Sequence, residues 1–316
     1  MPELPEVEHL RRSLDPIVVG ALVQSVRVAR RDVVASPTSV RRSSDLETAL
    51  LVGSRIVATR RKGKQLALLA DSGRALVVQL GMTGSVTIEG GPPPEGMDGK
   101  HRHVIWELQA EAPQGSLPGN LTPNFRMAFR DPRRFGGVTP YASEADLTQA
   151  WSRLGPDGLT VTAKELEERL KGSQRPIKAA LLDQCVVAGV GNIYADESLH
   201  AASVHPLQSS SRINSLVLER LAAEIRRILN QAADAGGSTL RDYRDAFGQP
   251  GDAVQHHAAY GRAGQPCLRC QSRLTGIRLQ GRATVFCPRC QHLSTKSTTS
   301  RRQGKGARAT SQTRSR

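Results

Sequence analysis

The pattern of apolar and polar positions divides the chain into a β-rich first half and a helical second half. From Val23 to Leu80, short runs rich in Val, Ile and Leu are separated by Gly, Ser, Asp and Pro, as expected of an antiparallel β-sandwich. Before them, Val7–Leu14 has the spacing of an amphipathic helix. The clearest strand predictions are Val23–Val28, Arg55–Ala58, Gln65–Leu69 and Ala75–Leu80.

Helical patterns begin around Trp151, after Pro- and Gly-rich loops at Gly90–Gly99 and Ala112–Pro123. A Gly-bearing turn, Val186–Tyr194, joins two of the predicted helices. The helix that starts beyond this turn presents free backbone N–H groups to a phosphate, and Asn192 would add a side-chain donor. A purely structural turn is the more common role of such a segment. The predicted helices are Ala163–Lys171, Pro176–Gln184, Asn192–Ala201 and Ser215–Ala235.

Length and charge indicate several domains and a polyanionic partner. A chain of 316 residues with a formal net charge of +15 can hold two separate cores, so we predict domains at 1–145, 146–256 and 257–293. Residues 294–316 carry seven basic residues and no acid, which predicts a disordered basic tail and leaves +8 on the rest. No long apolar run or basic amphipathic helix is evident, so nucleic acid fits better than a membrane. No apolar leader follows the acidic start, so we expect a cytoplasmic, nucleoid-associated protein.

Four of the five cysteines form two CxxC pairs, Cys267 with Cys270 and Cys287 with Cys290, separated by sixteen residues. This spacing supplies four thiolates for one tetrahedral Zn²⁺, with a β-hairpin between the pairs. Because four cysteines leave no open coordination position for water, we expect a structural zinc. The fifth cysteine, Cys185, lies among Leu and Val residues and is predicted to be a buried core thiol.

The chain begins with the octapeptide MPELPEVE. Removal of the initiator methionine would expose Pro2 as a terminal amine with a pKa near ~8, of which roughly a tenth is neutral at pH 7. A neutral secondary amine can attack a sugar aldehyde carbon and form an iminium, while the carboxylates of Glu3 and Glu6 move protons. Taken alone, the octapeptide is equally consistent with an extended leader before a helix.

Further motifs follow in order: RRKGK, LGMTG, DPRRFGG, PIKAALLDQ, GVGNIYADESL, YGRAGQPC and GRATVFCPRC. With them, the chain closely resembles the formamidopyrimidine-DNA glycosylase family, bacterial repair enzymes for oxidised purines. The resemblance implies an α+β fold: an N-terminal β-sandwich domain with a flanking N-terminal helix, then a helical domain with a helix–two-turn–helix motif and a C-terminal zinc β-hairpin. It also implies a monomer that binds double-stranded DNA in the cleft between the domains.

The resemblance assigns catalytic roles residue by residue. Pro2 matches the nucleophile that attacks C1′ of the damaged nucleotide, Glu3 the acid/base residue beside it and Glu6 a carboxylate that assists there. Lys64 matches a lysine that contacts phosphate and donates a proton in β-elimination. Arg282 matches the arginine of the zinc hairpin that grips phosphates and is linked to δ-elimination. Without this context, Lys64 and Arg282 would be read as solvated surface charges.

Enzymes that act on a base inside a duplex must extrude it, and the gap must be filled. The resemblance gives this role to Met82, Arg133 and Phe135, where otherwise the two apolar residues would be assigned to the core. Gln79 stands where the family usually has histidine, and it cannot become cationic. Further implied DNA contacts are His101, Arg134, Arg175, Lys178 and Asn192. A lesion-capping loop at about Gly236–Gly251 would offer Ser238, Thr239 and Tyr243 to the flipped purine.

We therefore predict a bifunctional glycosylase and apurinic/apyrimidinic lyase. It would excise 8-oxoguanine or formamidopyrimidine opposite cytosine and cleave the strand by β- and δ-elimination. One alternative is an endonuclease VIII-type enzyme for oxidised pyrimidines, which Leu4 and the DPRRFGG segment disfavour. The other is a zinc-containing protein that recognises damaged DNA without cutting it, which the joint presence of Pro2, Glu3 and Lys64 disfavours.

Overall fold

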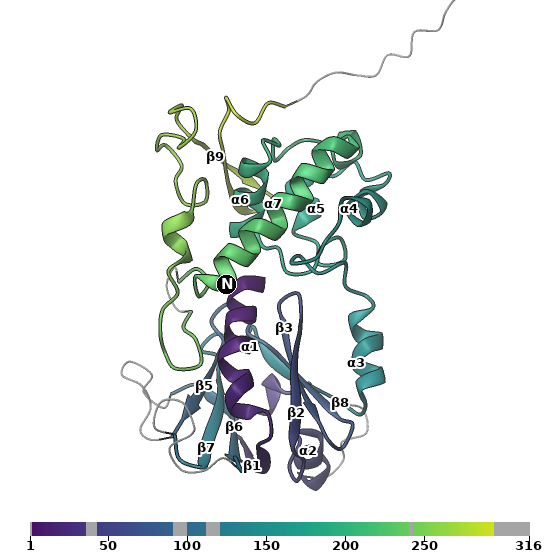
Figure 1. Cartoon of the computed structure of the whole chain (residues 1–316), viewed down its shortest axis with the longest axis vertical. Helices are drawn as coiled ribbons and strands as arrows, with labels where there is room; N and C mark the ends of the chain where they lie inside the picture. Colours follow the sequence, from purple (N-terminus) through teal and green to yellow (C-terminus); the bar gives the residue numbers. More distant parts are fainter. Residues whose placement is uncertain (1, 36–42, 91–99, 112–120, 240–242, 294–316) are drawn as a thin grey trace, which may run out of the picture.

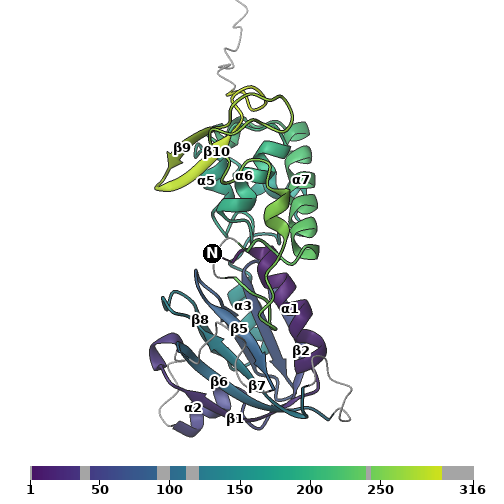
Figure 2. The same cartoon turned by 90° about the vertical axis from the view of Figure 1, so that its left-hand side faces the viewer.

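The computed structural model describes residues 2–35, 43–90, 100–111, 121–239 and 243–293. One lobe is built of β-strands and the other of helices, and the N-terminal end of helix α1 lies at their junction (Figures 1 and 2). The predicted loops at 90–99 and 112–123 lie largely outside the described residues, and the predicted tail at 294–316 lies entirely outside them.

Helix α1 (Leu4–Val18) is longer than the predicted Val7–Leu14 and joins the two lobes. A capping box fixes its start, because the backbone N–H of Glu3 donates to the carboxylate of Glu6 while the side chain of Glu3 accepts from the first turn. Leu4 packs in the core of the helical lobe, whereas the apolar residues of the later turns pack in the core of the β lobe. The first turn of α1 therefore belongs to both cores.

The β lobe is a sandwich of two four-stranded antiparallel sheets, in the orders β1-β6-β7-β5 and β2-β3-β4-β8. Strand β2 was predicted as Arg55–Ala58 and continues to Lys62, so the basic RRK run lies at the end of that strand. The strands are β1 (Leu22–Val28), β2 (Ile56–Lys62), β3 (Gln65–Ala70), β4 (Ala75–Gln79), β5 (Ser85–Glu89), β6 (Arg102–Gln109), β7 (Asn124–Arg130) and β8 (Gly137–Tyr141). The short helices of this lobe are η1 (Arg31–Val33) and α2 (Ser43–Ala49).

The helical lobe follows the prediction closely, except around one turn. Helix α5 ends at Leu181 instead of Gln184, because the carboxylate of Asp183 accepts the backbone N–H of Cys185 at 3.0 Å and turns the chain. Cys185 is exposed, so the prediction of a buried core thiol is wrong. The helices are α4 (Ala163–Leu170), α5 (Ile177–Leu181), α6 (Asn192–Ala201), η3 (Ser210–Arg212), α7 (Ser215–Asp234) and η4 (Ala253–His256).

Two segments pack across the predicted domain boundaries, which stay predictions. The boundary at residue 145 falls inside α3 (Glu144–Trp151), whose Leu147 packs against the buried apolar residues of strands β3 and β4. Ala246 packs in the core of the sandwich, and its carbonyl accepts the N–H of Ile88 at 2.9 Å. The chain beyond α7 thus returns to the β lobe before it forms the hairpin of β9 (Thr275–Leu279) and β10 (Arg282–Phe286). Within the described ranges, no helix is both long enough and apolar enough to cross a membrane.

Candidate active site

The N-terminal segment is held by the start of helix α6. The carboxylate of Glu3, 2% exposed, accepts the backbone N–H groups of Gly191 at 2.6 Å, Ile193 at 2.9 Å and Tyr194 at 3.5 Å. A Cβ at position 191 would lie 2.3 Å from Cδ of Glu3, so only glycine permits this approach. The amides that the sequence offered to a phosphate are therefore occupied by a carboxylate of the same chain, which also complements the helix dipole.

Asn192 and Leu4 complete this contact on its two sides. Asn192 opens α6 and is half-buried, and within the described residues its Oδ1 is a buried oxygen that finds no hydrogen-bond partner. Leu4 donates its N–H to the carbonyl of Gly189 at 3.1 Å. Gly189 has a φ of 108° and lies so close to the Leu4 side chain that a Cβ would be 2.3 Å from Cδ1. The two glycines of the turn, Gly189 and Gly191, thus leave the space that the side chains of Leu4 and Glu3 occupy.

Glu6 lies one turn along α1, is 1% exposed and accepts hydrogen bonds on both oxygens. Oε2 accepts the N–H of Glu3 at 2.7 Å, and Oε1 accepts the hydroxyl of Tyr194 and the N–H of Ser238, each at 2.6 Å. Burial and the neighbouring Glu6 carboxylate raise the pKa of Tyr194 well above its ordinary value, so the phenol remains a donor. Sequence reasoning did not assign Tyr194, although it lies inside the GVGNIYADESL motif.

Two of the three residues predicted to bind the lesion, Ser238 and Tyr243, hydrogen-bond to Glu6 in this structure. Ser238 and Tyr243 are 5% and 7% exposed, and the hydroxyl of Tyr243 donates to the carbonyl of Glu6 at 2.9 Å. Thr239 donates to the carbonyl of Tyr243 at 3.2 Å and accepts the N–H of Gly251 at 2.7 Å. Their hydroxyls are therefore engaged inside the protein, and the described part of this loop holds Glu6 in place instead of presenting these groups to a cavity.

Pro2 lines a cavity of about 180 Å³ at the junction of the lobes, together with Lys64, Gln79 and Phe135. Lys64 stands in the turn between β2 and β3. Burial lowers the pKa of Lys64, and the carboxylates of Glu3 and Glu6 oppose that shift. Burial likewise raises the pKa of Glu3, and Lys64 opposes it. Pro2 and Lys64 thus line one cavity, and the buried carboxylate of Glu3, next to Pro2 in the chain, acts on the charge of Lys64. Ionisable groups with shifted pKa values are frequent in active sites.

The turn that carries Lys64 is anchored by a buried ion-pair network. Arg61 forms a bidentate pair with Asp157, at 2.7 and 2.9 Å, and its Nε donates to Glu8 at 2.9 Å. Asp157 also accepts the N–H of Gly63 at 2.8 Å. Arg61 is therefore a structural link between the lobes and α1 that the RRKGK motif alone did not indicate.

The three residues proposed to fill the gap in DNA lie on two exposed loops. Met82 is 40% exposed and Phe135 is 60% exposed, so the alternative that they are core residues is wrong. The guanidinium of Arg133 lies 4.7 Å from the centre of the Phe135 ring. Asp131, which is fully buried, ties the loops together: it accepts the Thr83 hydroxyl at 2.5 Å and the N–H of Arg133 at 3.2 Å.

Three further basic residues predicted to contact DNA are exposed. His101 adopts a φ of 62° beside the loop of Asp131 and accepts the N–H of that aspartate on its carbonyl. Arg134 pairs with Asp32 at 2.6 Å, and Arg175 pairs with Asp183 at 3.0 Å. Exposed pairs of this kind are weak, so a phosphate can compete for both arginines.

Lys178 does not fit the prediction of a DNA contact. Its side chain is completely buried, and its ammonium forms an ion pair with Asp196 and donates to the carbonyl of Ala283 and to the hydroxyl of Thr284, each at 2.8 Å. Asp196 in turn accepts the N–H of Val285 at 3.0 Å. Lys178 and Asp196 thus bind helices α5 and α6 to strand β10, beside the exposed Arg282 at the start of that strand.

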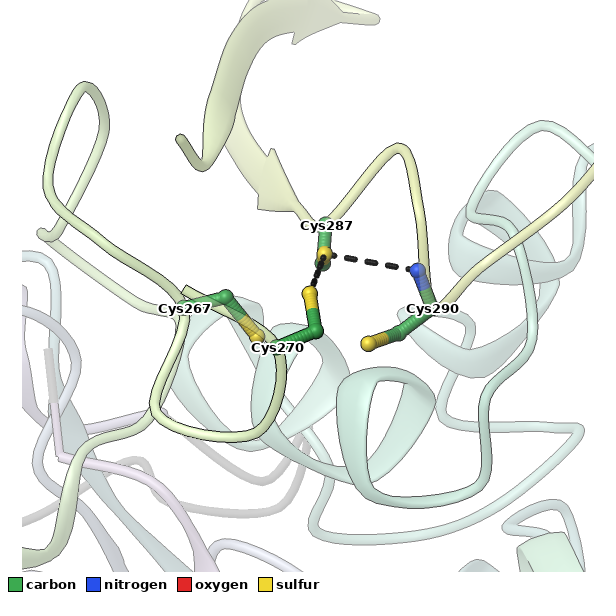
Figure 3. A group of neighbouring side chains, drawn as sticks. All are labelled: Cys267, Cys270, Cys287 and Cys290. Atoms are coloured by element: carbon green, nitrogen blue, oxygen red, sulfur yellow. Dashed lines mark hydrogen bonds between the residues drawn. The ribbon is translucent and has the colours of Figure 1, made fainter. Parts of the chain in front are cut away.

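The four cysteines of the CxxC pairs converge at the base of the hairpin (Figure 3). Their Sγ atoms lie within 4.8 Å of one another, and those of Cys270 and Cys287 are 3.5 Å apart, too far for a disulfide. Two sulfur atoms that each lie about 2.3 Å from one tetrahedral Zn²⁺ are separated by a distance close to the 3.5 Å between Cys270 and Cys287. The donor set therefore fits one structural zinc held by Cys267, Cys270, Cys287 and Cys290.

Three family profiles cover most of the chain in the order of the lobes. The formamidopyrimidine-DNA glycosylase N-terminal domain matches residues 1–138, the H2TH domain of the same enzymes matches 154–244, and a zinc finger found in FPG and IleRS matches 264–293. A formamidopyrimidine-DNA glycosylase of Thermomicrobium roseum is 40% identical over 301 residues, which cover 93% of this chain and 100% of that protein. The chain belongs to the formamidopyrimidine-DNA glycosylase family.

Solved structures of the family agree with this assignment. A mutant of Lactococcus lactis Fpg in complex with a Fapy-dG containing DNA has a TM-score of 0.78 at 29% identity, over 92% of this chain and 100% of that one. The MutM (Fpg) protein of Thermus thermophilus has a TM-score of 0.75 at 36% identity, over 93% and 100%. The predicted family, the α+β fold with its zinc finger and the class of DNA repair glycosylases are thereby confirmed.

Proposed function

We propose that this protein excises oxidised purines from duplex DNA through an imine formed by Pro2 and then cleaves the abasic strand. The observation that carries the proposal is the cavity that Pro2 shares with Lys64, backed by the buried carboxylates of Glu3 and Glu6. A glycosylase with a lyase activity needs a weakly basic amine, a proton donor for the leaving base and a proton donor or acceptor for the eliminations. Pro2, Glu3 and Lys64 can fill these three roles, and they lie at the junction of the two lobes.

In the proposed reaction, the nitrogen of Pro2 attacks C1′ and the bond from C1′ to the base breaks. Glu3 is suited to hold a proton because burial raises its pKa, and Lys64 is suited to release one because burial lowers its pKa. Arg282, exposed at the start of β10, is placed to bind the phosphates of the strand that is cleaved. Zinc at the four cysteines would hold the hairpin and takes no part in the chemistry.

For the substrate, we propose 8-oxoguanine and formamidopyrimidines opposite cytosine. Support comes from the relatives, one of which was solved with Fapy-dG containing DNA and another with an abasic site containing DNA. Exposed Met82, Arg133 and Phe135 would enter the duplex in place of the extruded nucleotide. With DNA as the substrate, we propose a cytoplasmic, nucleoid-associated enzyme.

Borohydride trapping on abasic DNA tests the imine, because only an imine-forming protein becomes covalently attached. We expect Pro2→Gly to slow base excision greatly while DNA binding stays within a few fold, since phosphate contacts are spread over many residues. Lys64→Ala should slow strand cleavage. Lys62→Ala removes the same charge two residues earlier on β2 and serves as its control. Undiminished trapping by a protein whose terminal amine has been blocked would contradict the proposal.

The substrate is tested separately, with one duplex series. The duplexes carry 8-oxoguanine, formamidopyrimidine or thymine glycol, each opposite all four bases. We expect the fastest single-turnover excision for the two purine lesions opposite cytosine. Faster excision of thymine glycol would assign the enzyme to oxidised pyrimidines while leaving the imine mechanism intact.

A further inference from the structure

A continuous chain of hydrogen bonds leads from Glu6 away from the cavity of Pro2. Oε1 of Glu6 accepts the hydroxyl of Tyr194 at 2.6 Å, and that oxygen lies 3.1 Å from the hydroxyl of Ser238. The hydroxyl of Ser238 lies 2.9 Å from Nε2 of His257. Glu6 and Tyr194 are each 1% exposed and Ser238 is 5% exposed, whereas His257 is partly exposed. His257 therefore forms the outer end of the chain.

The number of protons available fixes the direction of donation in every one of these hydrogen bonds. Tyr194 has a single hydroxyl proton, which it donates to Glu6, so the contact between Tyr194 and Ser238 is a hydrogen bond only when the serine is the donor. Ser238 has then used its own proton, and Nε2 of His257 must donate to it. Every donor in this arrangement points toward Glu6. Such a chain passes a proton inward, from His257 to Glu6, when each hydroxyl hands its proton to the next oxygen.

The outer end of the chain opens into a second cavity, of about 170 Å³. Among the described residues, none that lines this cavity also lines the cavity of Pro2. The groups around His257 have opposing effects on its pKa: burial lowers it, the carboxylates of Glu197 and Glu6 raise it, and His256 lowers it. The other charged or titratable side chains that line this cavity are Tyr194, His200, Arg227 and Arg269.

The proposed reaction needs a proton from outside. Pro2 brings one N–H to the nucleotide, and the iminium keeps none. The opened sugar gains a hydrogen on O4′ and the released base gains another, while the iminium carries one positive charge. Formation of the imine therefore consumes one proton, and no electrons are transferred. DNA bound over the cavity of Pro2 would restrict water there, whereas the cavity beside His257 lies elsewhere on the protein.

We propose that His257, Ser238 and Tyr194 form a relay that delivers this proton to Glu6 from water in the second cavity. The inference rests on the function proposed above. His257 takes up a proton from water on its free ring nitrogen and releases one from Nε2 to Ser238. Ser238 passes its own to Tyr194, and Tyr194 protonates Glu6, whose Oε2 contacts the N–H of Glu3, the residue next to Pro2. Glu6 then serves as the proton source for the reaction. His257 touches no substrate in this scheme and acts through Glu6.

Two substitutions at His257 separate a relay from simple support. His257→Gln keeps an N–H donor toward Ser238 but cannot take up a proton near neutral pH. We expect His257→Gln and His257→Ala to slow single-turnover imine formation at least about tenfold, within the range that general acid catalysis contributes. The loss should shrink at alkaline pH, where the wild-type ring is neutral as well because burial lowers its pKa, and added imidazole should restore His257→Ala, because the adjoining cavity has room for the ring. Gln255→Ala, at an exposed residue of η4 that does not line this cavity, should behave as wild type.

Zinc content and binding to DNA with a stable abasic analogue verify that each variant is folded. A His257→Gln protein as fast as wild type at every pH would overturn the relay, because a hydrogen bond alone would then suffice. Failure of imidazole to restore a slow but folded His257→Ala protein would also overturn it, in favour of packing. Neither result would affect trapping through Pro2. Loss of trapping in the wild type itself would instead reject the proposed function.

Discussion

Lys178→Met distinguishes a lysine that holds the zinc hairpin from one that contacts DNA. The substitution keeps an unbranched side chain of similar length but removes the ion pair with Asp196 and the two hydrogen bonds to Ala283 and Thr284. Asp196 is 1% exposed and would remain buried without its cation. Breaking a buried pair from one side costs about 3–5 kcal/mol. We expect the free energy of unfolding to fall by about this amount, a large share of a typical stability of about 5–15 kcal/mol.

Urea unfolding of the zinc-loaded full chain measures this loss. The proteins compared are wild type, Lys178→Met, Asp196→Leu and the double variant. We expect the double variant to recover most of the stability, because well-packed apolar residues often replace a buried ion pair without cost. Arg175→Met is the control, since it breaks the 3.0 Å pair with Asp183 on the surface of the same segment. Such an exposed pair contributes about 0–1 kcal/mol.

The opposite pattern would refute this reasoning. If Lys178 bound a DNA phosphate, Lys178→Met would lower the magnitude of the log–log salt slope of DNA binding by about 0.9 and leave the free energy of unfolding nearly unchanged. Asp196→Leu would then have its own independent effect, and the two changes would add in the double variant. Additive losses together with a reduced salt slope would restore the DNA contact predicted from the sequence.

Three further changes test the site from other directions. Burial alone would raise the pKa of Glu8, but hydrogen bonds from three arginines lower it to about 2, so Glu8→Gln should reduce the free energy of unfolding by about 3 kcal/mol near neutral pH. A carboxyl group whose pKa is lower in the folded protein stabilises the fold at a pH above its unfolded pKa. The difference in the free energy of unfolding between wild type and Glu8→Gln should therefore narrow as pH falls from 4.5 toward 2. Glu168→Gln, at an exposed residue, should unfold like wild type at every pH. Cys287→Ser should release zinc, measured by atomic absorption, and weaken DNA binding, whereas Cys185→Ser, at the exposed lone thiol, should change neither. Gly191→Ala should displace the Glu3 carboxylate and slow single-turnover excision on the order of a hundredfold, and an unchanged rate would mean that the contact is dispensable.

The sequence predicted those features that depend on local patterns. Alternation of apolar residues located strands β1 to β4, the bounds of α6 agreed at both ends, and the spacing of the cysteines predicted the four-sulfur cluster. Local patterns also explain the early start of α1, since Glu3 and Glu6 have the spacing of a capping box.

Contacts between distant segments could not be predicted in this way. A lysine such as Lys178 is usually exposed, and its burial depends on Asp196 and on the backbone of a hairpin more than a hundred residues later. The hydroxyls of Ser238 and Tyr243 were assigned to the lesion from the family's capping loop, and in this structure they contact the Tyr194 hydroxyl and the Glu6 carbonyl. Cys185 was assigned to the core from its apolar neighbours, and the turn at Asp183 exposes it.

The contact between Glu3 and the start of α6 joins residues that are 188 positions apart, and it has a consequence for inheritance by recombination. A chimera that took the β lobe from one relative and the helical lobe from another would keep most of each core, apart from Leu4 and Ala246, which pack in the core of the opposite lobe. It would also pair the Glu3 carboxylate of one parent with the α6 turn of the other, and a mismatch at Gly191 or Leu4 would displace Pro2. The first turn of α1 must therefore come from the same parent as the helical lobe. A functional chimera then needs two crossovers, one just after the first turn of α1 and one between the lobes.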